Sequence, residues 1–223
     1  MEERFVYSVR GRGYRYGEPV ERILPNAFVM GVAMDKSEIS TAPGIREAAE
    51  VAGSYLRAAV PALVTASYLR SLGYEAVAHI DGESELVKPP LAEKCGFGKI
   101  GRHGLLVSKA YGSLLRLSAV TTDAPLATYS GGPEDFPLEK ACEACNKCAA
   151  FCPANAIPEG SIIDEWGNAV RNIDHEACFD MWTRFGTDCG VCIAACPYNA
   201  SGSDGRAREG SPDFLKNFMF DRT

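Results

Sequence analysis

The chain has 223 residues, of which 46% are apolar and 23% are charged, and its formal net charge at pH 7 is −6. This composition is typical of a soluble globular protein. The negative charge argues against a general surface for nucleic acid or anionic membranes. No run approaches the roughly 18 apolar residues of a membrane span, and the start lacks the apolar core of an export signal. We therefore expect a cytoplasmic protein that binds neither nucleic acid nor membrane.

The first third of the chain predicts a strand followed by a long helix. Residues 1–22 are polar, and we expect them to form a loosely packed arm. Residues 26–34 are short, apolar and bounded by Asn and Asp, which predicts a buried strand. Residues 45–74 predict a helix that Pro61 either kinks or splits in two.

Further strands and a short helix are predicted before the cysteine-rich part. The strands are expected at 75–80, 105–108 and 115–123. The glycine-rich segment 88–104 begins with a pattern that indicates a short helix. A strand, a long helix and then further strands predict a layered α+β or α/β domain over about residues 20–125.

Eight of the nine cysteines lie between Cys142 and Cys196. A reducing cytosol disfavours disulfides, so metal ligation explains this clustering better. One block reads CxxCxxCxxxCP, and the second consists of Cys178, ten intervening residues, and then a CxxCxxxCP run that starts at Cys189. This is the pattern of ferredoxins with two clusters, in which the fourth cysteine of each block crosses to the other cluster. The alternative is zinc, but zinc ribbons use two CxxC pairs set well apart.

The crossed pattern predicts two sets of four ligands, each for one [4Fe–4S] cluster. The first set is Cys142, Cys145, Cys148 and Cys196. The second set is Cys152, Cys178, Cys189 and Cys192. Such close spacing lets a loop wrap one cube while its backbone N–H groups point at the sulfurs. Two adjacent cubes conduct electrons, so the roughly 125 residues before them should hold the chemistry that accepts these electrons.

The segment 88–126, KPPLAEKCGFGKIGRHGLLVSKAYGSLLRLSAVTTDAPL, resembles the corrinoid-binding core of reductive dehalogenases and, more distantly, epoxyqueuosine reductase. The resemblance covers about residues 23–199 and includes both cysteine blocks. It implies an α+β fold: a nitroreductase-like corrinoid-binding domain at 1–130, followed by a ferredoxin-like module with two [4Fe–4S] clusters at 131–223. Electrons would pass from a low-potential donor, such as a ferredoxin or flavodoxin, through the clusters to cobalt.

The resemblance also implies a site for the corrinoid, a cobalamin, along the glycine-rich segment and the turn that follows it. The implied contacts are Gly96, Gly98, Gly101, Arg102, His103, Gly112 and Ser113. The glycines would let the backbone approach a bulky cofactor, and the alternative is an ordinary turn. A dinucleotide loop is a weak explanation, because this GxGxxG pattern precedes a strand and not a helix.

In reductive dehalogenases a helix tyrosine near the cobalt donates a proton, and Tyr55 falls at the matching place. The ordinary tyrosine pKa is about 10, so a nearby cation must lower it for this role. The family's usual basic position holds Leu114, and Arg116, on the same face of a strand, is the candidate substitute. The alternative is that Tyr55 is only a buried structural tyrosine. Ser54 stands where epoxyqueuosine reductase has an aspartate, which argues against that activity.

Two functions follow from these observations. The first is an oxygen-sensitive iron–sulfur oxidoreductase that passes low-potential electrons through its clusters to a corrinoid and reduces a small substrate. The second is an electron-transfer or corrinoid-activating protein that reduces a centre on a partner and has no substrate of its own. Besides the electron donor, a corrinoid protein and a second copy of this chain are candidate partners.

Overall fold

The computed structural model describes residues 1–10, 15–20, 23–81, 84–127, 137–160, 162–163, 169–170 and 172–200. The chain divides into two compact units whose segments alternate along the sequence. Unit 1 comprises Met1–Ala33, Gly53–Gly98 and Leu115–Glu134. Unit 2 comprises Met34–Ala52, Lys99–Leu114 and Asp135–Thr223. The domain boundary expected after residue 130 stays a prediction, and the tail expected at 201–223 lies outside the described residues.

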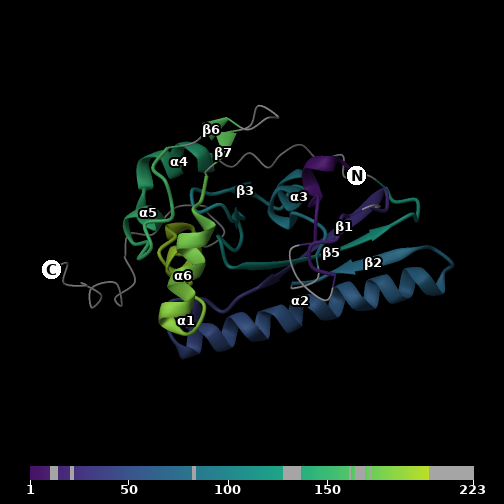
Figure 1. The fold of residues 1–223 in the computed structure, drawn as a ribbon, viewed down its shortest axis with the longest axis horizontal. Coiled ribbons are helices and arrows are strands. Elements are labelled where there is room, and N and C mark those ends of the chain that lie inside the picture. Colours follow the sequence, from purple (N-terminus) through teal and green to yellow (C-terminus); the bar gives the residue numbers. More distant parts are fainter. Residues whose placement is uncertain are drawn as a thin grey trace. The chain divides into compact units, whose positions relative to one another are not determined.

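Unit 1 is built on a three-stranded sheet (Figure 1). Strand β5 (Leu115–Thr122) lies between β1 (Asn26–Ala33) and β2 (Ala76–His79), and both neighbours run antiparallel to it. In this register Val120 lies opposite Phe28 on one side and Ala78 on the other. The strands fall where the apolar runs predicted them, and an antiparallel sheet combined with helices fits the α+β class.

Helices cover the sheet of unit 1 on two faces. Successive side chains of a strand point to opposite faces, and Ala119 and Val120 of β5 illustrate this. Val120 packs against small residues of α2 (Ile45–Ser71), a helix that belongs to unit 1 from Gly53 onward. Ala119 packs against Leu91 of α3 (Lys88–Lys94) and Phe5 of η1 (Glu3–Phe5).

Two expectations about unit 1 need correction. Pro61 does not split the predicted helix, because α2 is continuous over 27 residues with Pro61 inside it. The N-terminal arm is not loosely packed in its described part. Phe5 is 4% exposed, and Val6 forms a β-bridge with Leu86. The burial of Phe5 stabilises a segment whose polar composition had predicted little packing.

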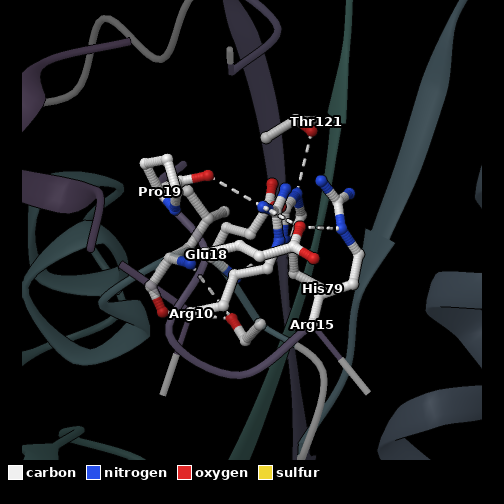
Figure 2. Close-up of polar contacts among 9 residues, drawn as sticks. Arg10, Arg15, Glu18, Pro19, His79 and Thr121 are labelled. Carbon is white, nitrogen blue, oxygen red and sulfur yellow. Dashed lines mark hydrogen bonds and ion pairs between the residues drawn. The ribbon is translucent and has the colours of Figure 1, made fainter. Parts of the chain in front are cut away.

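Polar contacts hold the arm in place (Figure 2). Arg10 donates to the carbonyl of Pro19 at 2.9 Å and forms an ion pair with Glu85. Arg15 donates to Glu18 at 2.7 Å. Nearby, the buried His79 on β2 contacts the Thr121 hydroxyl on β5 through Nε2 at 2.9 Å, which joins two neighbouring strands.

Unit 2 consists of short elements joined by loops. The strands β3 (Lys99–Ile100) and β4 (Leu106–Val107) form a small antiparallel pair, so the strand expected at 105–108 pairs with β3 and not with β5. A second pair is β6 (Ile162–Ile163) with β7 (Ala169–Val170). The helices are α1 (Lys36–Ile39), α4 (Leu138–Cys145), α5 (Lys147–Ala150), α6 (His175–Phe185), α7 (Val191–Ala194) and η2 (Pro197–Ala200). Among the described helices, none combines the length and apolar character needed to cross a membrane.

Candidate iron–sulfur centre

Unit 2 presents its cysteines on short helices and on the loops between them. Left-handed residues stand at the two points where the chain must turn between cysteines. Asn146, with φ 44°, separates α4 from α5, and Gly190, with φ 59°, precedes α7. These positive φ values, which favour Asn and Gly, turn the chain between successive thiols. Local sequence therefore explains how cysteines so close along the chain surround a common centre.

The four cysteines of the predicted first set line one cavity. Its empty space is about 330 Å³, part of which is open to solvent. Cys142 and Cys145 come from α4 and Cys148 from α5, whereas Cys196 comes from the other cysteine block, after α7. The remaining lining residues are Arg102, His103, Val107, Asn146, Pro197 and Tyr198. The fold thus brings together the four thiols that the crossed pattern groups.

Electrostatics links the thiols of the same set. Burial, together with charge on the neighbouring Cys142 and Cys196, raises the pKa of the Cys148 thiol to about 11. In the second set, burial raises the pKa of Cys189 to about 11, with a further contribution from Cys178 and Cys152.

Cys192 belongs to the same neighbourhood as the rest of the second set. Burial raises the pKa of Cys192 well above its usual range, and charges on Cys189, Cys178, Cys152 and the first-set Cys148 add to this shift. Buried thiols with raised pKa values hold their protons at neutral pH, so metal binding must displace these protons.

The loops also supply N–H donors to sulfur. The backbone N–H of Ala156 donates to Cys152 Sγ at 3.3 Å. Backbone N–H groups of Val191 and Tyr198 lower the pKa of Cys189 and Cys196, respectively, although burial outweighs them. Donors of this kind stabilise thiolates and tune bound clusters. Among the described residues, no three Cys, His, Asp or Glu side chains converge as the ligands of one metal ion do. The first-set thiols line a common space, and the assignment of each ligand to a cluster stays a prediction.

The segment Lys99–Leu114, predicted to contact a corrinoid, packs against the cysteine loops within unit 2. Arg102 is 5% exposed and donates to the carbonyl of Cys142 from both Nε, at 3.1 Å, and Nη2, at 2.7 Å. It also donates to the carbonyl of Glu159. Arg102 therefore clamps the start of the first cysteine block. The sequence analysis predicted Arg102 as a cofactor contact. It could not predict the hydrogen bonds to Cys142, which is 40 residues away in the sequence.

Gly112 and Ser113 make a second connection to the cysteine loops. Gly112 has φ +58°, and a Cβ there would lie 2.6 Å from the carbonyl carbon of Tyr198 and 2.7 Å from the backbone nitrogen of Asn199. Ser113 donates to Asn199 Oδ1 from its backbone N–H at 2.8 Å and from its hydroxyl at 2.9 Å. Its side chain also contacts Cys196 and lowers the pKa of that thiol. Asn199, which the sequence analysis did not single out, anchors this turn.

The other predicted corrinoid contacts are divided between the units. Gly101 lies in unit 2, where a Cβ would be 2.9 Å from Val107 and 3.1 Å from His103. His103 lines the first-set cavity, and burial lowers its pKa to about 4. Gly96 and Gly98 lie in unit 1, with φ values of 80° and 156°. Their role toward a corrinoid stays a prediction.

Unit 1 brings the two predicted catalytic residues into contact. The guanidinium carbon of Arg116 lies 4.2 Å from the centroid of the Tyr55 ring, and Nη1 donates to the phenol oxygen at 3.2 Å. Nε of Arg116 lies 3.4 Å from the hydroxyl of Ser54, which is fully buried. Leu114, at the family's usual basic position, is buried with 6% exposure and has no charge to offer. Arg116, the candidate substitute for the family's basic residue, thus contacts Tyr55, and the catalytic role of the pair stays a prediction.

Comparisons with known proteins agree with this geometry. The family model of the 4Fe-4S dicluster domain matches residues 141–200. The tetrachloroethene reductive dehalogenase of Sulfurospirillum multivorans is 33% identical over 189 residues, which are 80% of this chain and 37% of the relative. The chain is homologous to reductive dehalogenases. This dehalogenase homologue also superposes on a solved reductive dehalogenase, described as acting by B12-dependent dehalogenation, with a TM-score of 0.78 and 29% identity.

The homologue spans only part of these relatives. The structural alignment includes 92% of this chain but only 30% of the solved dehalogenase. A more distant relative is the epoxyqueuosine reductase of Aliivibrio fischeri, 38% identical over 152 residues, which are 62% of this chain and 39% of the relative. The resemblance inferred from sequence motifs is confirmed, and the dicluster match supports an iron–sulfur protein with two [4Fe–4S] clusters.

Proposed function

We propose that the dehalogenase homologue is an oxidoreductase that passes low-potential electrons through two [4Fe–4S] clusters to a corrinoid, for reductive cleavage of a small substrate. The observation that carries this proposal is the gathering of three cysteines of one block with Cys196 of the other around one cavity. Crossed ligation of this kind is the hallmark of paired clusters built for electron transfer. A ferredoxin or flavodoxin is the proposed donor of these electrons.

The described residues fit a corrinoid reaction at one point, the Tyr55–Arg116 pair. When bound, a corrinoid would supply a strongly reducing cobalt centre. The chain's own contribution is a half-buried phenol held by a cation. A guanidinium that donates to the phenol oxygen stabilises the phenolate, so Tyr55 becomes a better proton donor. The guanidinium stacked over the ring also restricts the orientation of the Tyr55 side chain.

A second candidate function is electron transfer to a partner's corrinoid. It is favoured by the contacts of three predicted corrinoid residues with the cysteine loops. Arg102 and Ser113 donate hydrogen bonds to these loops, and the backbone of Gly112 packs closely against them. These residues are then less available for a cofactor. The two functions differ in whether this chain itself holds cobalt.

Metal analysis distinguishes the two functions. The protein is produced with cobalamin supplied and purified without oxygen, and its iron, cobalt and absorption spectrum are measured. About eight irons and one cobalt per chain support the proposed oxidoreductase. About eight irons without cobalt, even after reconstitution, support the electron carrier. Zinc in place of iron would refute both.

The proton-donor role is tested in the cobalt-loaded protein with tetrachloroethene, the substrate named for the S. multivorans relative. We expect Tyr55→Phe to lower turnover by about 10²- to 10⁴-fold, the usual contribution of a general acid, with iron and cobalt contents unchanged. Arg116→Lys keeps the positive charge but loses the planar guanidinium that stacks on the Tyr55 ring, so we expect a smaller loss of turnover than for Tyr55→Phe. Tyr68→Phe is the matched control, because Tyr68 lies on the same helix with 62% exposure. Full turnover by Tyr55→Phe would remove the proposed acid.

A further inference from the structure

His103 is a buried histidine in the wall of the first-set cavity. It is 6% exposed and belongs to the loop between β3 and β4. Its Nδ1 accepts a hydrogen bond from the backbone N–H of Leu105 at 3.1 Å. Its Nε2 is buried and has no hydrogen-bond partner among the described residues. One ring nitrogen is therefore satisfied and the other is not.

The hydrogen bond to Leu105 assigns the tautomer of His103. A nitrogen that accepts a hydrogen bond carries no proton, so the proton of the neutral ring is on Nε2. In a doubly protonated ring, Nδ1 would also carry a proton, and that N–H would face the N–H of Leu105 without an acceptor between them. Nε2 is thus a buried donor, and leaving such a donor without an acceptor destabilises the fold. A buried unsatisfied group in a native fold calls for an explanation, and one explanation is an acceptor that belongs to a bound group.

The cavity that His103 lines offers sulfur as the acceptor. Its wall contains the thiols of Cys142, Cys145, Cys148 and Cys196. Of the other polar side chains in the wall, Arg102 donates to the carbonyl of Cys142, and Asn146 donates to Glu159 from Nδ2. The Oδ1 of Asn146 is buried without a partner among the described residues and is the competing acceptor. We propose that His103 donates a hydrogen bond from Nε2 to a sulfur of the cluster held by these four cysteines, and thereby raises the reduction potential of that cluster. The inference rests on the proposed function only in that this cluster must be a [4Fe–4S] cluster.

The direction of the effect follows from charge. Reduction adds one negative charge to the cluster, and its sulfurs become better acceptors. A hydrogen bond to sulfur is therefore stronger in the reduced state and stabilises that state. Hydrogen bonds to charged groups are stronger than those to neutral groups. We expect loss of the donor to lower the ratio of reduced to oxidised first cluster about tenfold at a fixed solution potential, which corresponds to about 59 mV for one electron.

Two substitutions separate the donor from the packing of the ring. His103→Asn keeps an oxygen near the position of Nδ1 to accept from Leu105, but it has no donor at the position of Nε2. His103→Gln reaches further and places an amide N–H close to the position of Nε2. The full chain carrying its clusters is titrated with a reductant in each variant, and the reduced clusters are followed by electron paramagnetic resonance. The Cys145→Ser variant shows which signal belongs to the first cluster.

We expect His103→Asn to shift the first cluster about tenfold toward the oxidised form, and His103→Gln to restore most of the ratio. The second cluster should titrate unchanged in both variants. Equal titrations in wild type and His103→Asn, or a shift confined to the second cluster, would overturn the inference. In either case wild type still holds its two clusters, and the proposed function stands. A wild-type protein without [4Fe–4S] signals would instead refute the proposed function.

A measurement on the wild-type protein covers the case in which neither variant assembles its clusters. Histidine labelled with ¹⁵N is incorporated, and pulsed electron paramagnetic resonance is recorded on the reduced first cluster. A ¹⁵N coupling to the cluster supports the hydrogen bond from His103, because neither His79 nor His175 is among the residues that line the cavity. Absence of any coupling overturns it.

Discussion

Replacing Gly112 by alanine should loosen the cysteine loops of unit 2. Two costs add at this position. The left-handed backbone, with φ +58°, costs alanine about 1–2 kcal/mol. The new Cβ would lie 2.6 Å from the carbonyl carbon of Tyr198 and 2.7 Å from the nitrogen of Asn199, and backbone atoms cannot rotate away. Overpacking of this kind costs about 1–3 kcal/mol. We therefore expect Gly112→Ala to lower the free energy of unfolding of unit 2 by about 2–5 kcal/mol.

Gly186→Ala provides the matched control for Gly112→Ala. Gly186 has φ +70° at the end of α6, also in unit 2, and a Cβ there meets nothing within 4 Å. It should cost only the backbone contribution of about 1–2 kcal/mol. Loss of cluster absorbance in urea, measured without oxygen, reports the stability of unit 2 for both variants. If the two glycine variants lose their clusters at the same urea concentration, the close approach of the Gly112 turn to Tyr198 and Asn199 does not contribute.

Two further predictions concern the ligand sets and a buried histidine. Cys196→Ser should reproduce the spectrum of Cys145→Ser and not that of Cys192→Ser, although Cys192 is only four residues away; identical spectra for Cys196→Ser and Cys192→Ser would contradict crossed ligation. Burial lowers the pKa of His79 to about 4 from 6.5, so the unfolded chain binds a proton that the folded chain does not between these values. The contribution of neutral His79 to the free energy of unfolding should be fully present above pH 6.5. It should fall by up to about 3 kcal/mol as the pH drops toward 4. Urea unfolding from pH 7 to 4 should show a shallower decline for His79→Gln, and parallel curves for the two proteins would refute this account.

Local patterns in the sequence predicted the elements well, because they depend on neighbouring residues. The apolar run at 26–34 became β1, and the run at 115–123 became β5, at nearly the expected bounds. The spacing of cysteines grouped Cys142, Cys145 and Cys148, since a tight turn brings nearby thiols together. It also grouped Cys196 with them, because in ferredoxins with this pattern the fourth cysteine of each block binds the other cluster.

Contacts between distant segments were not predictable in the same way. Arg102 was expected at a cofactor, yet its guanidinium donates to the Cys142 carbonyl 40 residues away. Ser113 contacts Asn199 at a separation of 86 residues. Neither the periodicity nor the composition of a segment predicts such contacts, because they depend on the tertiary arrangement of distant segments. Tyr55 and Arg116 were proposed as partners from the family resemblance and from the alternation of side chains along a strand, and the structure places them in contact.

The crossing of ligands makes the two cluster sites depend on each other. Charge on Cys148 raises the pKa of Cys192, although the pattern assigns these residues to different clusters. Cys148 lies on α5 and Cys192 on α7, and these two short helices pack against each other. Each helix carries a predicted ligand of one cluster and is followed by a predicted ligand of the other. A helix of four residues is only about 6 Å long, so the predicted assignment puts the two sites close together. With these ligands, movement of either helix would disturb both clusters, and we expect this shared support to keep the clusters at the short, constant distance that the proposed electron transfer requires.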